Sequence, residues 1–224
     1  MKNQIYKTLP RAEWDRVSIY ENGETLVKVE ETSHLKIGLV TKQYESLFYV
    51  RKTISDKLLK VSENLPKEIS LVLIEGYRTL KSQQQSWDAK FEKLKLENPT
   101  WSNEQIEKQV RLVLAKPAPL ANHHCGGAVD VTLAYSDGKL LDMGSPYPNE
   151  AMGADWHKKF QMLSAEITEE QRKNRKILRD AMEREDFVWY PGEWWHYCWG
   201  DRMWAVYSNQ TKCFYGSIEL DERK

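Results

Sequence analysis

The chain has 224 residues, and its 33 Lys and Arg residues are balanced by 33 Asp and Glu residues, so the formal charge at pH 7 is zero. This balance provides no basic surface of the kind that nucleic-acid-binding domains carry. No window approaches the roughly 20 consecutive apolar residues of a membrane-spanning helix. A chain of this length can bury a substantial core, and we expect one domain over residues 1–224.

The N-terminus and the cysteines indicate the cellular compartment in which we expect the protein. The first ten residues lack the continuous apolar segment of a secretory signal, and the three cysteines show no disulfide spacing. Both features favour a cytoplasmic protein with reduced thiols. A mature periplasmic form whose signal had been removed would have the same features.

Hydrophobic periodicity predicts the elements of the first half of the chain. Apolar residues recur every three or four positions before Pro66, which indicates an amphipathic helix with one buried face. Ser102 and Gln105 form a capping box that restarts a second helix after an interruption. In order, the predicted elements are a strand at 26–29, a helix at 41–65, a buried strand at 69–74 and an interrupted helix at 79–115.

The second half alternates strands, loops and one long helix. Thr168 and Gln171 form another capping box at the start of that helix. Proline and glycine mark the loop before it. The predicted elements are a strand at 128–135, a loop at 143–149, a helix from 168 to 185, a strand at 187–190 and further strands at 203–207 and 213–218.

Two zinc-competent side chains lie seven residues apart. His123 precedes Asp130, with two glycines between them, and Asp130 lies within an apolar, strand-like run. A catalytic zinc normally takes three protein ligands and keeps a fourth position for water. This stretch would therefore supply two of the three ligands. His124 is not expected to be a ligand, because alternation in an extended chain turns it away from His123.

Glu193 and His196 supply what the first stretch lacks. Pro191 and Gly192 precede them and permit a bend that brings both side chains to one site. His196 would be the third ligand, and Glu193 would be the general base that takes a proton from a zinc-bound water. Each piece alone has a common alternative, since a histidine flanked by aromatic residues is usually a packed histidine.

Three further residues near these motifs allow two interpretations each. Arg78 follows the buried strand at 69–74, where its guanidinium could bind an oxyanion or a substrate carboxylate, or form an ordinary surface salt bridge. Cys125 and Cys198 each lie two residues beyond a proposed ligand. Thiolates bind zinc strongly, so either cysteine could touch the metal, and inert packed thiols are the alternative.

In combination these residues resemble the D-alanyl-D-alanine dipeptidases, the vancomycin-resistance type within the zinc D,D-peptidase superfamily. The order of the motifs agrees from about residue 20 to residue 207. The matching patterns are S-x-H-x-x-G-x-A-x-D at 121–130, E-x-W-H at 193–196, G-Y-R at 76–78, M-G at 143–144 and N-R-x-x-L at 174–178.

The resemblance implies a fold and a metal site. The implied fold is α+β, with a central antiparallel sheet that carries the site and helices packed around it. One Zn²⁺ per chain would be bound by His123, Asp130 and His196, with Glu193 as general base and Arg78 stabilising the tetrahedral oxyanion. Two imidazoles and a carboxylate also suit iron or cobalt.

The resemblance also implies a metallopeptidase that hydrolyses D-alanyl-D-alanine or a related D-amino-acid dipeptide. Its partner would be a small peptide, with no nucleic acid and no membrane. One alternative is a D,D-carboxypeptidase that acts on longer peptidoglycan peptides. Another is a non-catalytic zinc-binding or effector module of the same fold, although retention of Glu193 favours an enzyme.

Two positions depart from the family pattern. Ala121 stands where the family has a serine, and Pro148 stands where it has an acidic residue. In the family these positions help to hold the free amino group of a dipeptide, and losing a charge partner for a buried ammonium is costly. Either Glu150 substitutes after a local shift, or the enzyme prefers a different peptide. The predicted substrate contacts are Tyr77, Glu150 and Trp195.

Overall fold

The computed structural model describes residues 7–9, 11–40, 42, 46–112, 114, 116–118, 122–147 and 156–220. Within these segments the helices are α1 (Arg11–Asp15), α2 (Lys52–Glu63), α3 (Leu80–Glu97), α4 (Asn103–Val110), α5 (His157–Phe160), α6 (Glu169–Arg184) and α7 (Arg202–Tyr207), with the 3-10 helix η1 at Asn122–Cys125. The strands are β1 (Ser18–Ile19), β2 (Leu26–Lys28), β3 (Leu35–Ile37), β4 (Tyr49–Arg51), β5 (Ile69–Glu75), β6 (Ala128–Tyr135), β7 (Val188–Trp189), β8 (His196–Cys198) and β9 (Lys212–Cys213).

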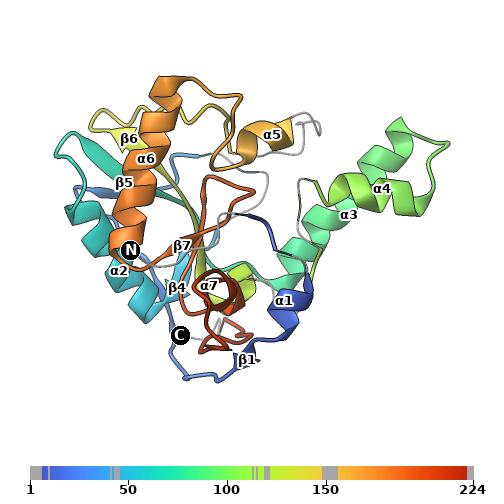
Figure 1. Cartoon of the computed structure of the whole chain (residues 1–224), viewed down its shortest axis with the longest axis horizontal. Coiled ribbons are helices and arrows are strands. Elements are labelled where there is room, and N and C mark those ends of the chain that lie inside the picture. The colour runs from blue at the N-terminus through green and yellow to red at the C-terminus, as the bar shows by residue number, and fades with distance from the viewer. Residues whose placement is uncertain are drawn as a thin grey trace.

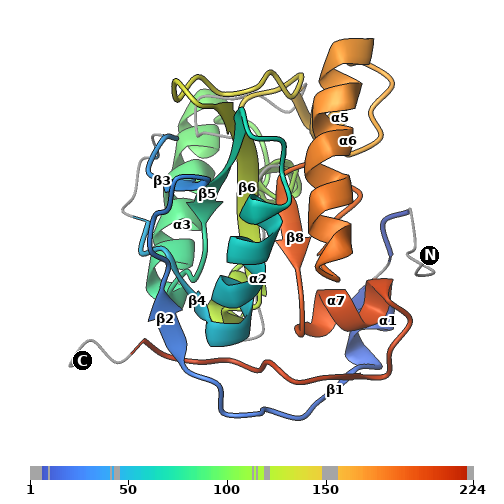
Figure 2. The same ribbon diagram turned by 90° about the vertical axis from the view of Figure 1, so that its left-hand side faces the viewer.

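The main sheet has five strands in the order β3-β5-β6-β8-β7. Its pairs are antiparallel except for β3 and β5, which run parallel. The prediction of an antiparallel sheet is therefore correct only in part, because the sheet is mixed. A parallel pair needs a crossover connection, and the segment between β3 and β5 provides one that includes β4 and α2 (Figure 2).

Helices α2 and α6 lie side by side on one face of this sheet (Figure 2). The large hydrophobic core lies between them and the sheet, and the sheet residues that contribute to it include Leu71, Leu73, Val129, Val131 and Tyr197. Successive side chains of a strand point to opposite faces. Asp130 and His196 alternate with these core residues, so both point to the face away from α2 and α6.

The face that carries Asp130 and His196 has its own, smaller core. Ala128 and Cys198 belong to it, together with residues of α7 and Cys213 of β9. A third cluster, around Trp87 and Ile106, joins α3 to α4. Figure 1 shows that α3 and α4 form a hairpin that projects from the rest of the molecule. Across the segments that the structure describes, no helix combines the length and the apolar character needed to cross a bilayer.

Three predicted elements differ from the structure. The helix predicted from residue 41 begins only at Lys52, because Tyr49–Arg51 form β4 and pair with β2. The strand predicted at 203–207 is helix α7, which begins where the Asp201 side chain accepts a hydrogen bond of 2.7 Å from the backbone N of Trp204. Of the strand predicted at 213–218, only Cys213 lies in a strand, β9. The continuous apolar run at 203–207 packs into the smaller core from a helix, so tertiary packing overrides the strand propensity of the run.

Candidate metal centre

Asp130 and His196 are direct partners in the antiparallel pairing of β6 with β8. His196 Nδ1 lies 2.9 Å from Asp130 Oδ1, and both side chains are almost fully buried. On the other side of β6, Glu75 at the end of β5 is paired with Asp130. Three adjacent strands thus place Glu75, Asp130 and His196 in one row across the sheet.

His123 reaches the same point from η1. Its Nε2 lies 3.3 Å from Asp130 Oδ1, and its ring lies 5.0 Å from that of His196, centroid to centroid. One ligand atom from each of His123, Asp130 and His196 lies within 4.8 Å of the others, and this is the one such group among the described residues. The structure therefore brings together the three predicted ligands.

The two glycines after this segment permit the close approach. Gly126 has a φ of 73°, and a Cβ there would lie 2.5 Å from Leu26 Cδ2. A Cβ on Gly127 would lie 2.9 Å from the carbonyl oxygen of Trp199. A side chain at Gly126 would crowd β2, and one at Gly127 would crowd the residue that follows β8, so either substitution would displace η1. The segment is a 3-10 turn rather than the extended chain predicted, yet His124 still lies outside the ligand group.

The ring nitrogens of His123 and His196 have different partners. His123 Nδ1 donates to the backbone oxygen of Gly76 at 2.8 Å, which leaves Nε2 to face Asp130 and to bind a metal when one is present. His196 faces Asp130 with Nδ1, while its buried Nε2 has no hydrogen-bond partner among the described atoms. Asp130 Oδ2 accepts a hydrogen bond of 2.7 Å from the hydroxyl of Tyr147.

The electrostatics also suit a cation. Burial alone would raise the pKa of Asp130, but the charges and hydrogen bonds of His123 and His196 outweigh it and hold this pKa well below its usual range. Burial would lower the pKa of His196, but the contact with Asp130 raises it. An ionised carboxylate and two imidazoles whose nitrogen atoms lie close together form a donor set that fits a divalent metal such as zinc.

Glu193 lies in the turn that precedes β8. The turn is closed by hydrogen bonds from Glu193 N to Tyr190 O at 3.2 Å and from His196 N to Glu193 O at 3.3 Å. Burial raises the pKa of its carboxyl to about 7, and the charge of Asp130 adds to this effect, while His196 and Arg78 oppose it. A carboxyl with a pKa near neutrality is suited to accept and return a proton at physiological pH.

Helix α6 fixes this turn through a buried arginine. Arg175 donates to the backbone oxygens of Met143 at 2.7 Å and Lys159 at 2.7 Å, and its guanidinium lies 5.6 Å from the ring centroid of Trp194. Trp194, next to Glu193, donates from Nε1 to Ser145 Oγ at 2.8 Å. The N-R-x-x-L and M-G motifs therefore support the turn that carries Glu193.

Arg78 lies just beyond β5, as predicted, and it is partly exposed. Its Nη2 donates to Glu75 Oε2 at 3.0 Å, and its backbone N donates to His123 O at 3.2 Å. Lys42 forms an ion pair with the same Glu75 oxygen. Burial would raise the pKa of Glu75, but the charges of Arg78 and Lys42 lower it, so this carboxylate is ionised and holds both cations.

Sequence reasoning missed Glu75, Lys42 and Tyr147. Glu75 could have been noticed as an acidic residue that ends a buried strand. Tyr147 lies in a loop identified only by its prolines and glycine, and Lys42 lies within the segment predicted as a helix. No local pattern marks either of them.

The predicted substrate contacts have different surroundings. Tyr77 is fully buried, and its hydroxyl donates to the backbone oxygen of Ile218 at 3.0 Å, so that hydroxyl is held by the C-terminal segment. Trp195 is also buried and packs edge-on against Tyr147 and Phe160. Glu150, like the departures Ala121 and Pro148, lies outside the described residues.

The cysteines near the ligands are packed thiols. Cys125 Sγ donates to the backbone oxygen of Asn122 at 2.8 Å. Burial raises the pKa of Cys125 and of Cys198 well above the usual range, so both stay protonated. Neither belongs to the group of converging ligand atoms.

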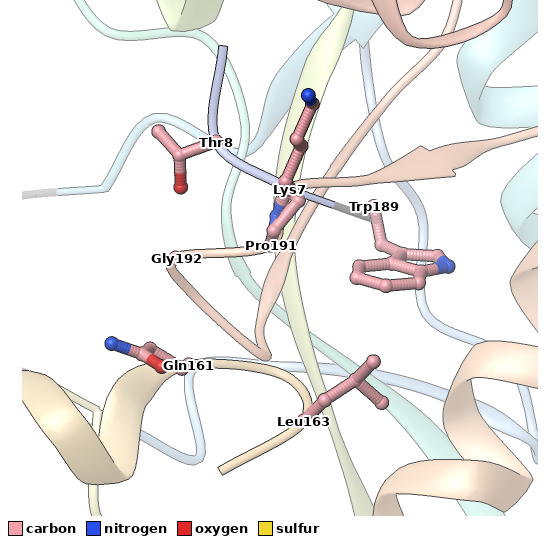
Figure 3. A pocket seen from close by; sticks show the side chains of 7 residues that line it. All are labelled: Lys7, Thr8, Gln161, Leu163, Trp189, Pro191 and Gly192. Carbon is pink, nitrogen blue, oxygen red and sulfur yellow. The ribbon is translucent and has the colours of Figure 1, made fainter. Parts of the chain in front are cut away.

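A hollow lies beside the turn that leads to Glu193. It has a volume of about 220 Å³, and it is lined by Lys7, Thr8, Gln161, Leu163, Trp189, Pro191 and Gly192. In Figure 3 the segment with Lys7 and Thr8 and the segment with Gln161 and Leu163 lie on opposite sides of the turn. The three candidate ligands do not line this hollow.

Known proteins are similar to this chain in sequence. Residues 38–217 match the family described as D-ala-D-ala dipeptidase. The D-alanyl-D-alanine dipeptidase of Synechocystis sp. is 31% identical over 132 residues, which cover 52% of this chain and 53% of that protein. The enzyme of the same name from Enterococcus faecium is 29% identical over 148 residues, covering 64% and 69%. The chain thus aligns with about half the length of the Synechocystis relative.

Two solved structures were also found to be similar. One is a vancomycin-resistance D,D-pentapeptidase VanY in complex with Zn(II), with a TM-score of 0.45 and 16% identity over 89% of this chain and 96% of that chain. The other is the LD-carboxypeptidase LdcB, with a TM-score of 0.44 and 20% identity over 85% and 74%. The sequence match over residues 38–217 shows that this chain belongs to the D-ala-D-ala dipeptidase family of metallopeptidases.

Proposed function

We propose that this protein is a zinc-dependent dipeptidase that hydrolyses D-alanyl-D-alanine or a related D-amino-acid dipeptide. The observation that carries the proposal is the convergence of His123, Asp130 and His196, whose ligand atoms lie within 4.8 Å of one another. Their chemistry matches a catalytic zinc site with three protein ligands. The substrate class is taken from the curated relatives, which are named for D-alanyl-D-alanine.

The roles of the chain's own residues follow from their surroundings. His123 Nε2, Asp130 Oδ1 and His196 Nδ1 would hold the metal. Zinc, when bound, supplies a Lewis acid that polarises a carbonyl and makes water more acidic. Glu193 would take the proton of the attacking water and deliver it to the leaving amine. A carboxyl with a pKa of about 7 can perform both transfers.

Arg78 would bind the carbonyl oxygen as negative charge develops on it. Donors that are already oriented in a partly buried site stabilise such charge without reorganisation. The ion pair with Glu75 fixes one edge of the guanidinium, and the hydrogen bond from Arg78 N to His123 O ties its backbone to η1. The same contacts keep Arg78 beside the metal ligands.

The test is hydrolysis by zinc-loaded protein of three peptides. We expect cleavage of free D-alanyl-D-alanine and much slower cleavage of L-alanyl-L-alanine and of an N-blocked pentapeptide ending in D-alanyl-D-alanine. Released alanine is measured by chiral chromatography. Cleavage of the blocked pentapeptide alone would replace the dipeptidase by a D,D-carboxypeptidase. Stoichiometric zinc without hydrolysis of any peptide would favour a non-catalytic module.

A further inference from the structure

Lys42 is a buried lysine beside the candidate metal centre, and the proposed mechanism does not use it. It lies between β3 and β4, and its side chain is only 5% exposed. Its ammonium pairs with Glu75 and lies 5.8 Å from the ring centroid of Tyr147. Placing an ammonium in such a site is costly, so its position calls for a reason beyond surface solvation.

Two neighbours of Lys42, Glu75 and Tyr147, lie beside the candidate ligand Asp130. Glu75 is paired with Asp130 across β5 and β6, and residues in opposed positions have Cβ atoms about 5 Å apart. The hydroxyl of Tyr147 donates to Asp130 Oδ2 at 2.7 Å. The charges of Asp130 and Arg78 are also close enough to act on Lys42. The Lys42 ammonium is therefore within reach of a small molecule bound at the metal ligands.

The substrate class requires a cation at such a place. Consecutive Cα atoms of a peptide are 3.8 Å apart, so the carboxylate of a dipeptide lies within about 4 to 5 Å of its scissile carbonyl. If that carbonyl lies against the metal and Arg78, the carboxylate enters the same partly buried site. An unpaired carboxylate there would be strongly disfavoured.

We propose that Lys42 binds the free α-carboxylate at the C-terminus of the substrate, and this inference rests on the proposed peptidase function. Arg78 is assigned to the carbonyl oxygen, which leaves Lys42 as the second cation that Glu75 holds beside the ligands. The ammonium has three donors, and one of them would turn to the substrate carboxylate when substrate binds, while the ion pair with Glu75 stays in place.

This assignment predicts selectivity for a free C-terminus. A peptide with an amidated C-terminus has no charge to pair with Lys42 and would leave the polar groups of the site unmatched. The chain would therefore act at the end of a peptide and not within a longer one. The selectivity should reside in substrate affinity, because the carboxylate is present in both the ground state and the transition state.

The experiment measures binding separately from turnover. Zinc-loaded Glu193→Gln protein, which should not cleave, is titrated calorimetrically with D-alanyl-D-alanine and with D-alanyl-D-alaninamide. We expect the free dipeptide to bind about 10 to 100 times more tightly, the gain of one charge-assisted hydrogen bond. Adding Lys42→Met should reduce that ratio by about tenfold, whereas Lys42→Arg should largely keep it.

A matched control is Lys57→Met in the same background. Lys57 also lies over an aromatic ring, 4.8 Å from the centroid of Trp199, and it pairs with Asp186, but it belongs to α2 on the other face of the sheet. Lys57→Met should leave the ratio of the two affinities unchanged. Zinc content and thermal unfolding are measured for every variant, and Lys42→Gln replaces Lys42→Met if the latter does not fold.

The outcomes separate the two proposals. The measured quantity is the ratio of the affinity for the free dipeptide to the affinity for its amide. If this ratio falls by less than about threefold when Lys42 is replaced, or falls equally in Lys57→Met, the assignment of Lys42 is wrong. In either case wild-type protein can still hydrolyse the dipeptide. If wild-type protein hydrolyses neither peptide and Glu193→Gln binds neither, the proposed function itself fails, and the assignment fails with it.

Discussion

Asp130 on β6 and His196 on β8 are directly opposed, and His196 Nδ1 lies 2.9 Å from Asp130 Oδ1. Because the two side chains come from hydrogen-bonded strands, their separation is set by the sheet and not by a mobile loop. Sites built on strands hold their geometry more accurately than sites built on loops. A metal bound there would find two of its ligands already in place.

Glu193→Gln should abolish hydrolysis without removing zinc. Glu193 is absent from the group of converging ligand atoms, so the amide leaves the metal ligands intact. Loss of a general base costs about 10²- to 10⁴-fold in rate. Zinc content is measured by elemental analysis and turnover by release of D-alanine. His196→Ala is the comparison, and it should lose both zinc and activity. Near-full activity of Glu193→Gln would rule out the proposed base.

Tyr147→Phe should weaken zinc binding. The substitution removes only the hydroxyl that donates to Asp130 Oδ2, while the ring that packs against Trp195 remains. Hydrogen bonds to metal-ligating carboxylates typically contribute about 10- to 100-fold in metal affinity. Competition with a chelating dye gives the affinity.

Tyr207→Phe is the matched control for Tyr147→Phe. It removes a hydroxyl that accepts a hydrogen bond from Leu9 N, away from the metal ligands, and it should leave zinc affinity unchanged. Equal zinc affinities for the two variants would show that the hydroxyl of Tyr147 does not support Asp130.

Local patterns predicted the parts of the fold that depend on periodicity. The buried strands β5 and β6 and the capped helices α4 and α6 follow from apolar runs and capping boxes. The candidate ligands were also accessible, because their residue types and order are themselves the motif. The parallel pairing of β3 with β5 depends on a crossover, and no short-range pattern in the chain encodes it.

The residues that surround the ligands could not be predicted from local sequence patterns. Tyr147 contacts Asp130, 17 residues away in the chain, and Lys42 contacts Glu75, 33 residues away. Their roles arise only when the sheet brings separate segments together. Helix α7 shows the same limit, since tertiary packing of Met203 and Tyr207 decides between helix and strand.

Gly76→Ala should destabilise the protein and displace His123. A Cβ at Gly76 would clash with the backbone oxygen of Tyr49, so β4 or the end of β5 would have to move. The carbonyl of Gly76 also accepts the hydrogen bond from His123 Nδ1. Overpacking of this kind costs about 1 to 3 kcal/mol. Urea unfolding and zinc affinity should both report the change.

Gly216→Ala is the milder comparison for Gly76→Ala. The nearest atoms to its added Cβ lie 3.3 Å away and belong to the side chains of Glu21 and Ile19, which can adjust. An equal loss of stability in the two variants would contradict the special role of Gly76.

Metal-free protein should become less stable as the pH rises from about 5 to 8. Burial raises the pKa of Glu193 from 4.5 to about 7 and that of Asp201 from 3.8 to about 6. The folded state therefore binds more protons than the unfolded state in this window, so the free energy of unfolding falls with increasing pH. The contribution of Glu193 is at most about 3 kcal/mol, because one pKa unit corresponds to about 1.4 kcal/mol.

Glu193→Gln isolates this contribution. The amide stays neutral, so the variant should lose less stability between pH 5 and 8 than wild type and should be the more stable of the two at pH 8. Urea unfolding of both proteins in the presence of EDTA, followed by tryptophan fluorescence, measures the difference. If the free energy of unfolding changed equally with pH in both proteins, the carboxyl of Glu193 would not be held uncharged in the folded state, and its pKa would not be raised.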